Sequence, residues 1–103
     1  MIIYSVTVVI KKEVEESWLE WMKDVHIKDV LKTSYFINCE MQKQIIPEPA
    51  AGESIYIINY KTSSLERYNE YLMKEAPRLQ KEHTDKFFGN FKALRAVHQI
   101  IPG

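Results

Sequence analysis

Two of the three histidines lie where an imidazole could do chemistry. Counted from Leu65, His83 falls at the centre of an apolar helical stripe, and a histidine facing a core needs a polar partner there. It is either a structural histidine bonded to a strand residue or water, or a catalytic base or ligand contact in a cleft between sheet and helices. His26 flanks an earlier helical stripe near its end, where it is either a cation complementing the helix C-terminus or a ligand contact close to His83. Two histidines without a carboxylate partner do not predict a metal site.

Aromatic side chains could form the walls of a binding pocket. Trp18 and Trp21 lie on the apolar stripe of the first expected helix, so they either pack in the core or line an aromatic pocket. Aromatic residues make up 12% of the chain, which is slightly more than packing requires. The phenols that could line such a pocket are Tyr4, Tyr35, Tyr56, Tyr60 and Tyr68.

Several other polar side chains have two interpretations. Arg78 and Arg95 either bind a carboxylate ligand through both guanidinium nitrogens or form surface or interface ion pairs. Asn38 and Asn59 interrupt the apolar pattern of two expected strands. Each is either a polar residue of the dimer face or a ligand contact. Cys39 has no histidine or basic neighbour in the sequence, so we interpret it as a small buried apolar residue.

The first third of the chain predicts a strand and a helix that would position these residues. Residues 2–10 are rich in Val, Ile, Tyr and Thr, which favour strands. Residues 13–26 have apolar side chains three and four positions apart, as in an amphipathic helix. The members of this stripe are Val14, Trp18, Trp21, Met22 and Val25. After His26 the phase slips, which predicts a break or a short second turn near residues 27–32.

The remainder predicts a hairpin, a second helix and a last strand. Strand patterns at 34–45 and 54–61 flank a Pro- and Gly-containing loop, which favours an antiparallel hairpin. The segment Ser63–Glu66 has the pattern of a capping box, with Glu66 three residues after the Ser63 hydroxyl. The apolar stripe of the helix that follows comprises Leu65, Tyr68, Leu72, Ala76, Leu79, His83 and Phe87. Pro77 should kink this helix or begin a new segment, and residues 91–101 favour a final strand.

This order, β-α-β-β-α-β, predicts an α+β, ferredoxin-like fold in one domain spanning residues 1–103. Two right-handed crossovers joined by a hairpin give a four-stranded antiparallel sheet with both helices on one face. The other face still carries apolar and aromatic side chains. A second copy of the same sheet is the economical cover, so we expect a homodimer joined through the sheet face.

Composition excludes several classes of protein. The chain has 103 residues, zero formal net charge and one cysteine. It therefore lacks the basic excess of proteins that coat nucleic acid, and it cannot form an internal disulfide. The apolar start has neither a basic region before it nor a cleavage site after it, and it is too short to cross a bilayer. We expect a cytoplasmic protein without nucleic-acid or membrane partners.

Two segments resemble a known family. They are Trp18-Leu-Glu-Trp-Met22 within the first helix and Ala76-Pro-Arg-Leu-Gln80 within the second. Together with the opening strand they are similar to a small, uncharacterised bacterial family of unknown function. More broadly the chain resembles the dimeric α/β-barrel superfamily, which includes antibiotic-biosynthesis-monooxygenase and EthD-like proteins. The resemblance implies a homodimer whose sheets face each other, and a ligand cleft between sheet and helices, but no particular reaction.

These observations favour a homodimer that binds a small apolar or aromatic molecule without a cofactor. The expected ligand contacts are His26, Trp18, Trp21, Tyr4, Tyr68 and Arg78. The alternative is a cofactor-independent monooxygenase- or isomerase-like enzyme with His83 as its catalytic residue. A haem-binding relative is a minor option, because the haem-degrading arrangement of Asn, Trp and His does not map onto this chain.

Overall fold

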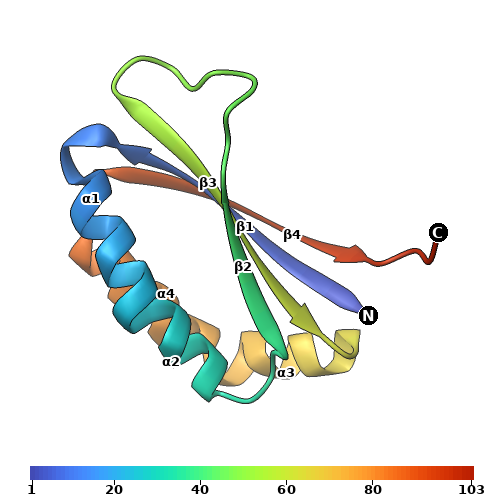
Figure 1. Ribbon diagram of the computed structural model, residues 1–103. Helices are drawn as coiled ribbons and strands as arrows, with labels where there is room; N and C mark the ends of the chain where they lie inside the picture. The colour runs from blue at the N-terminus through green and yellow to red at the C-terminus, as the bar shows by residue number, and fades with distance from the viewer.

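The computed structural model describes residues 1–103 as four strands and two interrupted helices. The elements are β1 (Ile2–Lys11), α1 (Lys12–Trp21), the wide π turn η1 (Met22–His26), α2 (Ile27–Lys32), β2 (Asn38–Lys43), β3 (Glu53–Thr62), α3 (Leu65–Lys74), α4 (Ala76–Lys86) and β4 (Phe91–Gln99). The sheet is antiparallel with strand order β2-β3-β1-β4, and the helices cover one of its faces (Figure 1). The predicted ferredoxin-like fold is confirmed.

Strand β1 lies at the centre of the sheet because it is apolar on both faces. It pairs with β3 on one side and with β4 on the other, and Val6 lies between Ile58 and Arg95. Its even-numbered residues face the helices, and Val8 and Ile10 among them are almost fully buried. The period-two alternation of a strand thus places one set of side chains in the core and the other on the open face.

The first helix changes character after His26, as expected, because residues 27–32 form the short segment α2, which is set off from α1 by the π turn η1. This π turn explains the phase slip. The π turn η1 inserts one extra residue, and such a turn rotates the residues beyond it around the helix axis. Val25 is consequently 40% exposed instead of lying on the apolar stripe, and Val30 faces the core. His26 lies inside the helix and not at its C-terminus.

The second helix begins and bends at identifiable residues. Ser64, not the predicted Ser63, is its N-cap, and its Oγ accepts a hydrogen bond from the Arg67 backbone N–H at 3.2 Å. The helix is interrupted at Glu75, and Pro77 lies in the first turn of α4, as predicted. Because α3 and α4 are separate segments, one continuous stripe does not describe both.

That interruption changes which residues of α3 are buried. Leu65 and Leu72 of the predicted stripe are exposed, and Tyr71 is buried in the core instead. The α4 part of the stripe is buried as predicted, with Ala76, Leu79, His83 and Phe87 all inside. A break of one residue between helical segments is enough to move the apolar face to the neighbouring position.

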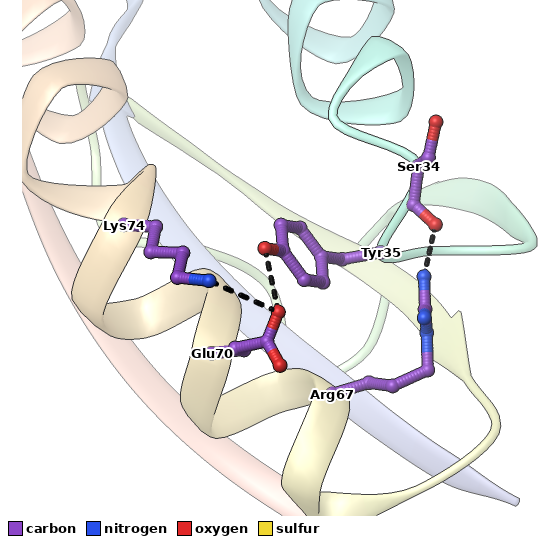
Figure 2. A network of polar contacts seen from close by, with 5 residues as sticks. All are labelled: Ser34, Tyr35, Arg67, Glu70 and Lys74. Carbon is purple, nitrogen blue, oxygen red and sulfur yellow. Dashed lines mark hydrogen bonds and ion pairs between the residues drawn. The ribbon is translucent and has the colours of Figure 1, made fainter.

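The sequence pattern predicts that residues 34–37 begin a strand. In the structure they form a connection instead, and β2 begins at Asn38. Ser34 has a left-handed backbone with φ of 70°, and Phe36 turns into the core instead of sharing a face with Asn38. Polar contacts to α3 hold this connection (Figure 2): Arg67 donates to the Ser34 carbonyl, and the Tyr35 hydroxyl donates to Glu70 at 2.9 Å. The contacts fix the edge of the sheet against α3.

The face of the sheet opposite the helices is open and carries both apolar and polar side chains. On the two central strands this face comprises Ile3, Ser5, Thr7, Val9, Lys11, Glu53, Ile55, Ile57, Asn59 and Lys61. On β4 the same face carries Leu94, which is 73% exposed. No helix in the structure has the length and apolar character needed to span a membrane.

A candidate ligand cavity between sheet and helices

A cavity of about 30 Å³ lies between the sheet and the helices. It is lined by 14 residues: Tyr4, Val6, Val8, Met22, His26, Val30, Ile58, Tyr60, Tyr71, Leu79, Gln80, His83, Ala93 and Arg95. Strands β1, β3 and β4 form its floor, and the helices form its roof. A site of this size holds about two water molecules, or a small chemical group of similar volume.

His83 is held in one protonation state by Trp18. The indole Nε1–H donates a hydrogen bond to His83 Nε2 at 2.9 Å, and both residues are buried. An indole N–H is only a donor, so this imidazole nitrogen carries no proton. The neutral ring then has its proton on Nδ1, which forms no hydrogen bond within the chain. The predicted polar partner therefore exists, but it comes from α1 and not from a strand.

His26 lies beside His83 in the same cavity. The two ring centroids are 5.7 Å apart, and the Trp21 ring stacks on His26 at 5.1 Å. His26 Nδ1 is buried without any hydrogen-bond partner. The π turn brings His26 here, because a regular helix would have left it at the flank of the stripe. A buried polar atom without a partner is uncommon in a folded protein, so this nitrogen marks an unusual polar site next to the cavity.

Burial keeps both histidines neutral at neutral pH. It lowers the pKa of His83 to about 4, with further lowering from His26 and Arg95. Burial also lowers the pKa of His26 to about 4, against an opposing effect of Asp29 and with a small contribution from Arg95. The cavity thus presents uncharged imidazoles, whose hydrogen bonds are directional, and not imidazolium cations.

The structure brings some of the predicted site residues together. Tyr4, His26 and His83 line the cavity. Trp18 and Trp21 lie behind the histidines and contact their rings. Tyr68 packs against the Tyr4 ring at 5.1 Å from α3. Trp18, Trp21 and Tyr68 each contact a residue of the cavity without being part of its lining.

The other predicted residues lie elsewhere. Arg78 is on the exposed side of α4, in ion pairs with Glu75 at 2.9 Å and Glu82 at 3.6 Å. Asn59 accepts a hydrogen bond from Ser5 at 2.6 Å on the open face. Cys39 is a half-buried free thiol whose pKa is raised by burial to about 11, so it stays protonated. No cluster of three or more His, Cys, Asp or Glu side chains is arranged to hold a metal ion.

The sequence pattern does not single out two of the lining residues, Tyr71 and Gln80. Tyr71 is one position from the apolar stripe that the unbroken helix predicted, and Gln80 follows Leu79 in α4. The interruption at Glu75 moves Tyr71 inward. In the sequence, Pro77 signals this interruption. It indicates that the residues before and after it belong to two helical segments, each with its own apolar stripe.

Replacing Trp18 by Phe should destabilise the protein by roughly 1–3 kcal/mol, the penalty for leaving a buried acceptor unpaired. Phe keeps the aromatic packing against Tyr56 but removes the donor to His83 Nε2. Urea denaturation measures the loss, and Trp21→Phe is the matched control because Trp21 forms no hydrogen bond to either histidine. Equal stability of Trp18→Phe and the wild-type protein would show that the hydrogen bond contributes nothing.

The family model described as Domain of unknown function (DUF4286) matches residues 1–101. The chain belongs to this family. The membership confirms the resemblance carried by the Trp18–Met22 and Ala76–Gln80 segments. No curated protein matches the chain by sequence.

Solved structures show where the DUF4286 fold belongs. A dimeric ferredoxin-like protein from an uncultured marine organism has a TM-score of 0.67 at 10% identity, over 99% of this chain and 97% of its own. An antibiotic biosynthesis monooxygenase has a TM-score of 0.67 at 10% identity, over 99% and 100%. An EthD family protein from Bacillus halodurans has a TM-score of 0.64 at 12% identity, over 98% and 100%. Identities this low establish a shared fold and leave function to the site.

Proposed function

We propose that this protein is a homodimer that binds a small apolar or aromatic molecule in the cavity between sheet and helices. The observation that carries the proposal is the cavity itself, a void beneath two neutral histidines in an otherwise packed interior. Protein interiors contain few voids larger than a water molecule, and a mainly apolar one is a default ligand site. Each protomer of this homodimer would be the single domain of residues 1–103.

Xenon is the direct test of this cavity, because small apolar cavities bind it. Xenon should shift the methyl NMR signals of Val6, Val8 and Leu79 in a saturable manner. Ala93→Leu, which fills the cavity from β4, should abolish the shifts, whereas Ala51→Leu in the exposed loop should preserve them. Benzene needs a larger space, so binding of benzene as well would show that the cavity widens for an aromatic ligand. Absence of xenon shifts in the wild-type protein would contradict the proposal.

The open face of the sheet supports the dimer. Exposed Leu94 and half-buried Ile55 and Ile57 lie on it, and a second copy would remove this apolar surface from water. One of the proteins of similar fold is described as dimeric. Two such sheets packed face to face would form the α/β barrel.

Replacing Ile57 by Lys should dissociate the dimer, because the new charge would have to be buried between the sheets. Sedimentation equilibrium at micromolar concentration should then give a monomer for this variant and a dimer for the wild-type protein. The control is Met73→Lys, which places the same charge on the exposed side of α3, away from the open face. A wild-type monomer at that concentration would refute the dimer.

An enzyme of the cofactor-independent monooxygenase or isomerase kind is the second candidate, and the Trp18–His83 hydrogen bond is the observation that favours it. Because Trp18 occupies the Nε2 lone pair, His83 would donate from Nδ1–H and polarise a carbonyl instead of acting as a base. The test is deuterium uptake next to the carbonyl of acetone in D₂O, where solvent removes the α-proton from the polarised ketone and returns a deuteron. Uptake above background that is lost in His83→Phe would support this candidate, and background uptake in the wild-type protein would oppose it.

We propose that this protein is located in a bacterial cytoplasm. Cys39 is a free thiol in the structure, and a single unpaired cysteine suits a reducing compartment. Similar folds occur in bacteria, as in the Bacillus halodurans protein. Fractionation of cells that express a tagged copy would test this placement.

A further inference from the structure

Arg95 is the one formally charged residue that lines the cavity. The other 13 lining residues include no Asp, Glu or Lys, and both histidines are neutral. Arg95 lies opposite Val6 on β4, which is an edge strand of the sheet, and Arg95 is exposed at the rim of the cavity. It forms no ion pair within the chain, whereas Arg78 is paired with two carboxylates. The cavity therefore has a guanidinium group without a counter-ion.

Phenol groups add unpaired donors to the same cavity. Tyr4, Tyr60 and Tyr71 line it, each is 3% exposed, and none of their hydroxyls is hydrogen-bonded within the chain. None of these hydroxyls is among the fully enclosed unpaired atoms, so solvent or a ligand can reach them. A phenol that stays protonated is a hydrogen-bond donor.

The imidazole of His83 contributes a donor and not an acceptor. Trp18 takes its Nε2 lone pair, which leaves the proton on Nδ1. The polar side chains that line the cavity are thus one arginine, three phenols, two neutral imidazoles and the Gln80 amide. Several hydrogen-bond donors next to an unpaired guanidinium are complementary to an anion.

We propose that the ligand of this cavity is a small monocarboxylate, with its carboxylate at Arg95 and a short apolar tail toward Val6 and Leu79. This inference rests on the proposed ligand-binding function and gives the chemical class of its ligand. Guanidinium and carboxylate are planar and pair through two parallel hydrogen bonds, which makes arginine the suitable cation. The cavity volume of about 30 Å³ admits a tail of only a few carbon atoms without rearrangement.

Propionate and its neutral isostere propionamide are the probes that test the charge. Amide ¹H–¹⁵N spectra recorded at constant ionic strength should show saturable shifts with propionate at β1, β4 and α4. Propionamide should bind at least about tenfold more weakly, because charge-assisted hydrogen bonds are roughly twice as strong as neutral ones. Arg95→Gln should weaken propionate binding by a similar factor and leave the weak propionamide binding unchanged. Arg67→Gln, an exposed arginine on α3, is the matched control and should bind propionate as the wild-type protein does.

The outcomes separate this inference from the function on which it rests. Equal binding of propionate and propionamide, or unchanged propionate binding by Arg95→Gln, overturns the carboxylate ligand. Xenon binding without propionate binding also overturns the carboxylate ligand, but it supports the proposed function, namely a cavity that binds small apolar molecules. If neither xenon nor propionate enters the cavity, the ligand-binding function itself fails. Long-range ¹H–¹⁵N spectra of the imidazoles give an independent check, since a proton on Nε2 of His83 would remove one proposed donor.

Discussion

Acidification from pH 6.5 to pH 4 should lower the free energy of unfolding by up to about 3 kcal/mol for each of His26 and His83. In the folded chain burial lowers both pKa values to about 4, from the ordinary value of 6.5. Between these two pH values the unfolded chain binds protons that the folded chain does not. Stability therefore rises with pH through this window, and it is lost as the pH falls.

The physical reason is that each imidazole would become a buried cation without a counter-ion. A proton on His83 Nε2 would face the Trp18 N–H, donor against donor, at the present 2.9 Å separation. His26 would face a neighbouring cation if both rings were protonated, since their centroids are 5.7 Å apart. Asp29 is the acidic group that opposes the shift at His26, and Arg95 reinforces the shift at both rings.

Urea denaturation at a series of pH values measures this effect. Carboxylates such as Glu15 and Glu70 also have lowered pKa values, but they titrate at and below their ordinary value of 4.5. The slope between pH 6.5 and pH 5 therefore reports the histidines. It should be largely absent in the double variant His26→Gln, His83→Gln and present in His98→Gln, which changes an exposed imidazole on β4. A flat profile in the wild-type protein over that range would mean that the imidazoles are not held neutral by burial.

Replacing Leu79 by Ala should cost about 2–5 kcal/mol of stability, the range for a buried leucine. Leu79 is fully buried in α4 and lines the cavity. Its loss enlarges a void that already exists, and the residues around that void have little freedom to collapse into it. We expect a value in the upper half of the range for that reason.

The same variant should gain a ligand. Benzene should raise the thermal midpoint of Leu79→Ala more than that of the wild-type protein, because the larger apolar cavity accommodates it and binding to the folded state alone adds stability. Leu72→Ala is the control from the neighbouring helical segment, where the leucine is exposed, and it should change stability by less than about 1 kcal/mol. A loss for Leu79→Ala no greater than for Leu72→Ala would show that the core around the cavity is not tightly packed.

Local patterns predicted the elements of this protein well. The strand-forming composition of β1, the turn-rich loop between β2 and β3, and Pro77 in α4 are signals that act within a few residues. Their order limits the topology to a ferredoxin-like sheet. The same patterns predict that His83 lies on a buried stripe and that His26 could lie near it, since both helices pack on one face of the sheet.

What the sequence by itself determined is therefore the type and order of the elements, because these depend on periodicity and local backbone preference. The tertiary structure decided the site. Only the π turn at Met22–His26 directs His26 inward, and only the interruption at Glu75 brings Tyr71 into the core. The Trp18–His83 hydrogen bond joins residues 65 positions apart, and Arg95 reaches the cavity through its pairing with β1. Such contacts depend on how the helices pack on the sheet. A phase change of one residue in a helix determines which side chains meet there, and the hydrophobic periodicity of the sequence does not show such a change.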